Sequence, residues 1–255
     1  MIHPEQDHNE SAHRILLALD YVHDKAILEA AALLAKSMRA SLQAIFVEDE
    51  ELRRVAQLPF TCEIGFGSAV IRRMELTRLE RDLKNHATEL QRMLRRNAAL
   101  NRVKWSFSVT RGSLPAAALT ATEADVYILP RRGSGYPEQP RHVPGVIATL
   151  LDGSPQSLHA LEVAVTLSNH IPLHIFIPAS EQGDVLRDRA MPLLERLQHT
   201  ALFIPIDDTS PETIAINVRT LRASLLVLGY AERYRDPDVL ESLQTATGTP
   251  LILAN

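Results

Sequence analysis

Short runs of consecutive apolar residues alternate along the chain with stretches in which apolar residues recur every three or four positions. Two of the runs, each ending in aspartate, are RILLALD at 14–20 and VIATLLD at 146–152. Each is followed by a helical pattern, at 24–40 and 154–171, and then by another apolar run, at 41–48 and 172–179. Continuous apolar strands between amphipathic helices are typical of parallel sheets covered by helices on both faces. The pattern therefore predicts an α/β fold.

The same order of elements occurs twice, with the two openings roughly 130 residues apart. The first half continues with a helix, a strand, a helix and a strand, predicted at 74–100, 103–110, 113–124 and 126–130. The second half continues in the same order, at 183–199, 201–206, 211–223 and 224–229, and adds a last helix and strand at 237–246 and 249–254. We therefore expect two tandem α/β units, of which the first lacks the last helix and strand.

A segment rich in glycine and proline, RRGSGYPEQPRHVPG, follows Pro130 and separates the two units. We expect the first unit at 13–133, with an insertion at 49–73, and the second unit at 144–255. The two units are predicted to pack together as a pseudo-dimer. Either the linker or the first strand of the second unit could fill the place of the first unit's missing last strand.

Composition narrows the class of protein further. Hydrophobic residues make up 45% of the chain and charged residues 23%, which is enough apolar material for a full core. The ten glycines form neither a Walker loop nor a Rossmann fingerprint. A single cysteine excludes an intrachain disulfide, and the polar opening segment, MIHPEQDHNESAH, does not read as a secretory signal. With no apolar run long enough to cross a bilayer, we expect a cytoplasmic protein.

Each half resembles the universal stress protein family, whose units are flavodoxin-like with strand order 3-2-1-4-5. The resemblance depends on the aspartates that end the first strands, Asp20 and Asp152, on the Leu/Ala-rich first helix, and on the Arg111-Gly112 turn. It depends also on the segments DVYILPRRG at 125–133 and TPLIL at 249–253. It covers nearly the whole chain except the first dozen residues and the insertion. It implies two tandem units with parallel sheets flanked by helices.

In nucleotide-binding members of that family, a segment with three spaced glycines after the fourth strand holds the phosphates. Amide groups and a helix start there converge on the anionic oxygens. This sequence departs from the pattern in both halves. Pro130 stands at the first glycine position of the first half, and Glu232 stands at the second glycine position of the second half. The resemblance thus implies a degraded nucleotide site and no cofactor, with ATP or AMP binding as the alternative.

The resemblance also implies candidate ligand-binding residues at the carboxyl ends of the strands, where open parallel sheets bind ligands. These candidates are Asp20, Val47, Gly112, Leu129, Arg131, Gly133, Asp152, Gly153, Ile177 and Gly229. A second interpretation is that the two aspartates only end strands and cap turns. Because Gly-Ser-Pro follows Asp152, capping of the next helix is the favoured role for that residue.

The segment 72–104 carries ten lysines and arginines against four acidic residues, whereas the chain as a whole has a net charge of −4. One interpretation is a basic surface for an anionic partner such as nucleic acid, an acidic protein or a lipid headgroup. The favoured interpretation is a solvated helix with intrahelical pairs such as Glu80–Lys84. No aromatic residues are interleaved for base stacking, so nucleic acid is the least expected partner.

Other chemistry finds little support in the sequence. Cys62 has no identifiable neighbour that would lower its pKa, so an inert thiol is favoured over a redox role. His170 and His174 are separated by Pro172, and no metal-binding motif occurs, so no metal is expected. Asp207 and Asp208 are better explained by a turn and helix cap than by paired catalytic carboxylates. No nucleophile motif is present, so we expect no enzyme of the wider adenine-binding α/β group.

The sequence therefore predicts a non-catalytic tandem protein that acts in a stress or regulatory response by binding a protein partner or by self-association. The alternative is an adenine-nucleotide sensor. It would hold its ligand through Asp20 or Asp152 and would use Arg131, Arg132 or Arg111 in place of the glycine loop, because arginine can bind phosphate bidentately.

Overall fold

The computed structural model describes residues 13–21, 25–64, 71–121, 123–131, 145–168 and 171–255. Its main feature is one nine-stranded sheet in the order β5-β2-β1-β6-β11-β10-β7-β8-β9. The first unit supplies four strands: β1 (Arg14–Leu19), β2 (Ser41–Asp49), β5 (Trp105–Gly112) and β6 (Val126–Leu129). The second unit supplies five: β7 (Val146–Leu150), β8 (Leu173–Pro178), β9 (Ala201–Ile206), β10 (Ala223–Gly229) and β11 (Leu251–Ala254). Within each unit the strands are parallel, as the continuous apolar runs predicted.

The two units are joined by the last strand of the chain. β11 pairs in parallel with β10 of its own unit and antiparallel with β6 of the first unit, so that Leu251 lies opposite Leu129 and Ala254 opposite Val126. The prediction that the first strand of the second unit fills the gap was therefore wrong, because β7 lies between β10 and β8. The linker named as the other candidate lies mostly outside the described residues. By pairing on both sides, β11 satisfies its own backbone groups and those of β6 together.

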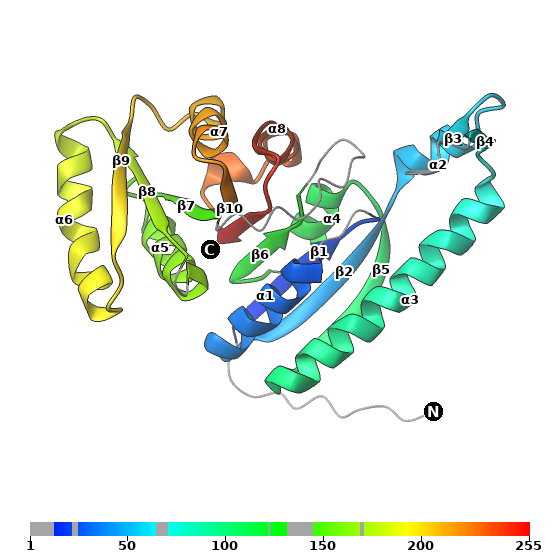
Figure 1. The fold of residues 1–255 in the computed structure, drawn as a ribbon, viewed down its shortest axis with the longest axis horizontal. Coiled ribbons are helices and arrows are strands. Elements are labelled where there is room, and N and C mark those ends of the chain that lie inside the picture. Colours follow the sequence, from blue (N-terminus) through cyan, green and yellow to red (C-terminus); the bar gives the residue numbers. More distant parts are fainter. Residues whose placement is uncertain (1–12, 22–24, 65–70, 122, 132–144, 169–170) are drawn as a thin grey trace.

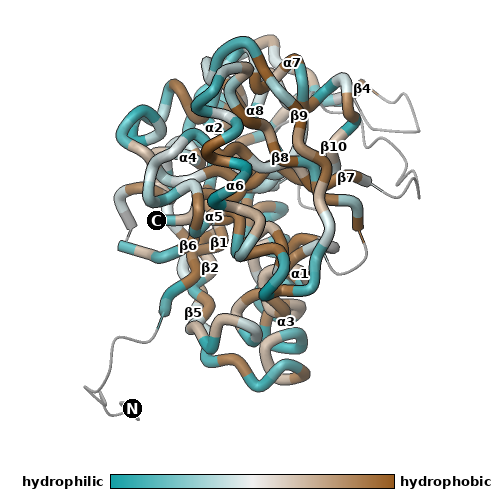
Figure 2. Tube along the Cα trace, turned by 90° about the vertical axis from the view of Figure 1, so that its left-hand side faces the viewer, coloured by the Kyte–Doolittle hydropathy of each residue, from teal (hydrophilic) through white to brown (hydrophobic). Residues whose placement is uncertain are grey.

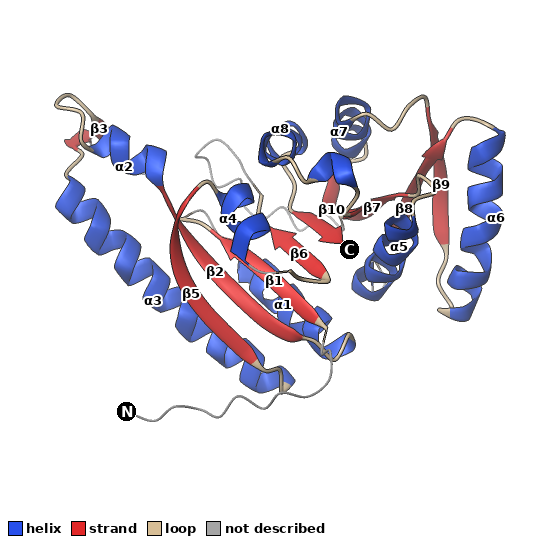
Figure 3. Ribbon diagram, turned by 180° about the vertical axis from the view of Figure 1, so that it is seen from behind, coloured by secondary structure: helices blue, strands red, loops and turns tan. Residues whose placement is uncertain are grey.

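Helices cover both faces of the sheet (Figures 1 and 3). One face carries α1 (Lys25–Ser37), α3 (Leu76–Asn101), α5 (Pro155–Ser168) and α6 (Glu181–Arg196). The other carries α4 (Leu114–Ala121), α7 (Pro211–Thr220) and α8 (Pro237–Thr247). Each face has its own buried apolar cluster, and both clusters run through the two units. Figure 2 shows the corresponding apolar stretches of chain in the strands, with polar stretches on the outer helices.

Local signals place the helix starts of the second unit where the sequence predicted them. Ser210 accepts a hydrogen bond from the Thr213 amide at 3.3 Å, and Asp236 accepts one from the Asp238 amide at 2.9 Å. In both helices the next residue after the cap is proline at the first helical position, which needs no amide donor. The 3₁₀ turn η1 (Glu232–Tyr234), between β10 and α8, was not predicted.

The insertion is more ordered than a simple loop. It contains α2 (Glu50–Ala56), capped by Asp49, and a separate two-stranded sheet of β3 (Cys62–Ile64) and β4 (Ile71–Arg73). These elements extend from the body of the first unit beside the start of α3 (Figure 1). No helix of the described residues has the length and apolar character needed to cross a bilayer.

Candidate functional site

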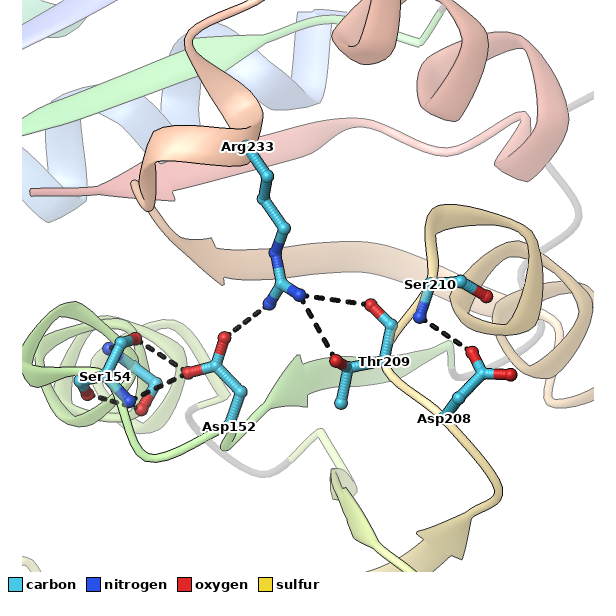
Figure 4. Close-up of polar contacts among 7 residues, drawn as sticks. Asp152, Ser154, Asp208, Thr209, Ser210 and Arg233 are labelled. Atoms are coloured by element: carbon cyan, nitrogen blue, oxygen red, sulfur yellow. Dashed lines mark hydrogen bonds and ion pairs between the residues drawn. The ribbon is translucent and has the colours of Figure 1, made fainter.

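In the second unit, the carboxyl edge of the sheet is occupied by a charged side chain of the protein itself (Figure 4). Asp152 follows β7, and Arg233 lies in η1 just after β10. The Arg233 guanidinium donates a hydrogen bond to Asp152 Oδ2 and forms an ion pair with it. It also donates to the main-chain carbonyl and to the hydroxyl of Thr209, each at 3.2 Å. Arg233 therefore links the ends of β7, β9 and β10.

Asp152 has a second role in the turn before α5. Its Oδ1 accepts hydrogen bonds from the Ser154 amide at 3.0 Å and from the Ser154 hydroxyl at 2.6 Å. Ser154 in turn accepts a bond from the Ser157 amide at 3.2 Å, so Ser154 is the residue that caps the helix. Between them, Gly153 has a φ of +90°, which favours glycine. Asp152 thus both supports the cap of α5 and holds Arg233.

Tyr234 lies beneath this ion pair and is fully buried. The Arg233 guanidinium carbon lies 5.0 Å from the centroid of the Tyr234 ring, within the range of a cation–π contact. Burial raises the pKa of the Tyr234 hydroxyl to about 12, because the phenolate would lose its hydration. The Arg233 guanidinium therefore contacts both a carboxylate and an aromatic ring.

The neighbouring turn after β9 is built from Asp208 and Ser210. The Asp208 carboxylate accepts a hydrogen bond from the Ser210 amide at 2.8 Å, and Ser210 caps α7. Hydrogen bonds from the Ser210 side chain and backbone, and from Thr213, lower the pKa of Asp208. The structure thus shows a turn and a helix cap at Asp208.

Gly229, at the end of β10, lies directly against the first turn of α5. A Cβ at this position would be 2.7 Å from the main-chain carbon of Gln156 and from the Ser157 amide nitrogen. Only glycine allows the strand to approach the helix this closely. The fold itself therefore requires this glycine, whatever the unit binds.

The candidate residues of the first unit that the structure describes lie at or near the carboxyl ends of neighbouring strands. Val47 and Leu129 are buried in the apolar cluster on the α4 face of the sheet. Asp20 and Arg131 are half-buried, after β1 and β6 respectively. Gly112 lies at the end of the outer strand β5 with a φ of +138°.

The other predicted positions lie in the second unit or outside the described residues. Ile177, the counterpart of Val47 in the second unit, is also buried, but in the cluster on the opposite face. Gly133 and Arg132 lie outside the described residues. Just before them, the carbonyl of Pro130 accepts a hydrogen bond of 2.8 Å from the Gln244 amide of α8. A buried side chain of the second unit thus binds the segment in which the phosphate loop of the first unit was sought.

The second unit also contains a histidine-lined cavity, far from the carboxyl edge. It has a volume of about 760 Å³ and is lined by the amino ends of β8 and β9 and by the end of α5, with His174 and His199 on its wall. Burial lowers the pKa of His174, which favours the neutral ring. No group of three or more potential metal ligands occurs among the described residues, and His170 lies outside them.

Sequence reasoning identified Asp152 but not the residue that pairs with it. Arg233 follows Glu232, which the resemblance places at a glycine position of the family, so the available signal was a charged turn. The folding of that turn back onto Asp152 could not be inferred from spacing alone.

Neither a protein-family model nor a curated protein sequence matches the chain. Among solved structures, a universal stress protein from Archaeoglobus fulgidus aligns with 95% of this chain and 96% of its own, at 12% sequence identity and a TM-score of 0.50. A protein of unknown function from Pseudomonas aeruginosa aligns with 96% of this chain and 92% of its own, at 10% identity and a TM-score of 0.44. A universal stress protein family member from Burkholderia pseudomallei aligns with 45% of this chain and 98% of its own, at 22% identity and a TM-score of 0.33.

The first of these similarities extends over nearly the whole chain. With the mostly parallel sheet and its flanking helices, it shows that the protein has a universal stress protein-like α/β fold, as the sequence predicted.

Proposed function

We propose that the chain is a non-catalytic, universal stress protein-like protein that acts in a stress or regulatory response by binding a protein partner. We propose further that it does not bind ATP in the manner of the nucleotide-binding members of that family. The observation that carries the second statement is the Asp152–Arg233 ion pair at the carboxyl edge of the second unit.

The ion pair opposes nucleotide binding in two ways. Asp152 already accepts three hydrogen bonds, so a ligand hydroxyl would have to displace one of them. Displacing Arg233 would also break its two bonds to Thr209, and hydrogen bonds to charged groups contribute about 1.5–3 kcal/mol each. A nucleotide would have to offset these losses without the glycine-rich loop that normally holds its phosphates.

One serine–histidine contact occurs among the described residues, and its burial supports a non-catalytic role. The Ser168 hydroxyl lies 2.6 Å from His199 Nε2, which is the spacing of an activated nucleophile. Ser168 is fully buried, however, and its hydroxyl also donates to the Val165 carbonyl at 2.6 Å. A substrate could not reach this oxygen. The pair is better explained as a satisfied polar contact in the core.

We also propose a cytoplasmic location, which the single cysteine of the chain fits.

Calorimetric titration of the purified protein with ATP, ADP, AMP and cyclic nucleotides tests the proposal. We expect no heat of binding and no thermal stabilisation, and no nucleotide absorbance in the purified protein. Micromolar binding that is lost on Asp20→Ala or Asp152→Ala would overturn the proposal in favour of the nucleotide sensor. The Arg219→Ala variant, which removes an exposed arginine elsewhere in the second unit, is the control.

A further inference from the structure

The nine-stranded sheet ends in β5 on one side and in β9 on the other, and the two edges differ (Figures 1 and 3). At the β9 edge, the Ala179 amide donates to the Ile206 carbonyl at 2.8 Å, so Ile206 faces β8. Its neighbour Pro205 therefore faces away from the sheet. Proline has no N–H, and placing it on an edge is one way in which proteins prevent another strand from pairing there.

The β5 edge has no such protection. The Leu42 amide donates to the Lys104 carbonyl at 2.9 Å, and Leu42 lies opposite Trp105 in the register. In a parallel ladder, the amide and carbonyl groups of the even-numbered residues of β5 therefore form the hydrogen bonds to β2. The backbone groups directed outward are those of Trp105, Phe107, Val109 and Arg111. None is proline, the register has no bulge, and no described strand pairs with this side.

Unpaired cations lie along the same edge. On α3, the His86 ring contacts Tyr21, which follows β1, and Phe46 of β2, at centroid distances of 5.1 and 5.9 Å. Lys84 and Arg95 lie about half a turn around the helix from His86, which places them on the flank toward the β5 edge. Both are exposed and form no ion pair with any described residue. Glu80 pairs with Arg53 at 2.6 Å and not with Lys84, whereas Arg78 and Asp82 form an intrahelical pair at 3.8 Å.

On the other face of the sheet, which carries α4, a polar groove lies beside β5. The short helix α4 leaves a groove of about 530 Å³ beside the outer strands. Its polar lining residues, which mostly carry hydroxyl or amide groups, include Gln43, Ser108, Thr110, Ser113 and Thr120. An additional strand at this edge would therefore have cations on one side and a hydroxyl-lined groove on the other.

We propose that the β5 edge binds an extended acidic segment of a partner protein, which adds to the sheet as a further strand. The backbone of the segment bonds to the outward groups of β5. Its alternate side chains carry carboxylates that face Lys84 and Arg95, and the others are small polar residues that enter the groove. This inference rests on the proposed partner-binding function and names the chemistry of the partner. A second copy of β5 fits less well, because a two-fold axis at this edge would bring two basic α3 flanks together.

The probe for the test is a fluorescein-labelled peptide of alternating glutamate and threonine, about ten residues long to match a strand. Fluorescence anisotropy should show saturable binding to the full chain. Val109→Pro removes one outward amide without touching the β2 ladder and should weaken binding about tenfold or more, whereas Val109→Ala should not. Lys84→Glu combined with Arg95→Glu should weaken binding by a similar factor, and the effect should shrink at high salt. Arg219→Glu, on α7 of the other unit, is the matched charge control.

A second experiment uses the wild-type protein and varies the peptide. Peptides N-methylated on one set of alternate residues should lose binding, and those methylated on the other set should keep it, because only one set faces β5. Equal binding by both sets, or by Val109→Pro and the wild type, would overturn strand addition. The proposal would also fail if the protein were a dimer that Val109→Pro dissociates, or if a single-stranded oligonucleotide bound more tightly than the peptide. None of these results bears on nucleotide binding, so the proposed function is tested separately.

Discussion

At the scale of single residues, the second unit shows how one arginine side chain can link the ends of three strands. Asp152 is a candidate because the sequence places it at the end of the first strand of its unit, and Arg233 gives that carboxylate a partner. The two side chains are 16% and 33% exposed, so water screens the pair only in part. Their contribution to stability can therefore be measured.

A double-mutant cycle of Asp152→Asn and Arg233→Met should give a coupling energy of about 1–3 kcal/mol, because each single change leaves a partly buried charge without its partner. The free energy of unfolding, from urea denaturation, provides the measurement. The exposed pair Arg54–Glu50, at 3.8 Å, is the control and should couple by about 0.5 kcal/mol or less. A coupling energy near zero at Asp152–Arg233 would show that the arginine does not hold this edge closed.

Asp208 offers a pH-dependent test of the neighbouring turn. Hydrogen bonds from Ser210 and Thr213 lower its pKa from the ordinary value of 3.8. A lowered folded-state pKa stabilises the protein above the unfolded value, and this contribution is lost as the pH falls through the folded value. An NMR titration should therefore give an Asp208 pKa below 3.8 that rises in Ser210→Ala. An unchanged pKa in that variant would exclude the Ser210 hydroxyl as a cause, because alanine retains the bond from the backbone amide.

At the scale of elements, close packing explains why the remaining glycines stand where they do. Gly229 allows β10 to lie against the first turn of α5, whereas Gly248 provides the left-handed residue that ends α8, with a φ of +63°. One is required by its surroundings and the other by its own backbone conformation. The sequence could place both at element ends but could not distinguish these two reasons.

Alanine substitutions at Gly229 and Gly248 distinguish the two reasons for glycine. Gly229→Ala should lower the free energy of unfolding by about 2–4 kcal/mol, because the new Cβ meets main-chain atoms that cannot move aside easily. Gly248→Ala should cost about 1 kcal/mol, since nothing lies within 4 Å and only the positive φ is strained. Thermal or urea denaturation measures both. Equal costs would contradict the close approach of β10 to α5.

The helix α3 and the insertion that contains α2, β3 and β4 show which elements the apolar periodicity could predict and which it could not. The periodicity of α3 predicted a helix with one apolar face, and Leu83, Ala87, Leu90, Leu94 and Ala98 are the residues that it buries. The insertion carried no clear period, so its helix and hairpin were not predicted. Asp49, which caps α2 through the Glu51 and Leu52 amides, was the available signal.

At the scale of the whole molecule, the two units are not equivalent. Among the described residues, the second unit contributes five strands to the large sheet, whereas the first contributes four and pairs the last of these with β11 of the second. Asn255 at the end of the chain donates its amide to the Asp125 carbonyl at 2.8 Å, which extends the same junction. The first unit thus depends on the second for one side of its sheet.

Dissection of the chain tests this dependence. A fragment of residues 145–255 keeps all five of its strands and should fold with a cooperative unfolding transition. Both fragments lose the β6–β11 pair. The fragment of residues 13–133 keeps only four strands of the large sheet and also loses the contact of α8 with Pro130, so it should aggregate or remain unfolded. Circular dichroism and size-exclusion chromatography of the two fragments provide the measurement. A stable, monomeric first fragment would contradict the shared role of β11.

The sequence by itself determined the α/β class, the repeated order of elements and most helix starts, because these follow from the period of apolar residues and from local capping. It also located Asp152, and it led to the proposal that the phosphate-binding glycines are lost. Only the tertiary structure decided that β11 joins the two units, that Arg233 closes on Asp152, and that β5 is the sheet edge without an outward-facing proline. The reason is physical: periodicity and caps act between neighbours in the chain, whereas strand order and ion pairs depend on which distant segments meet.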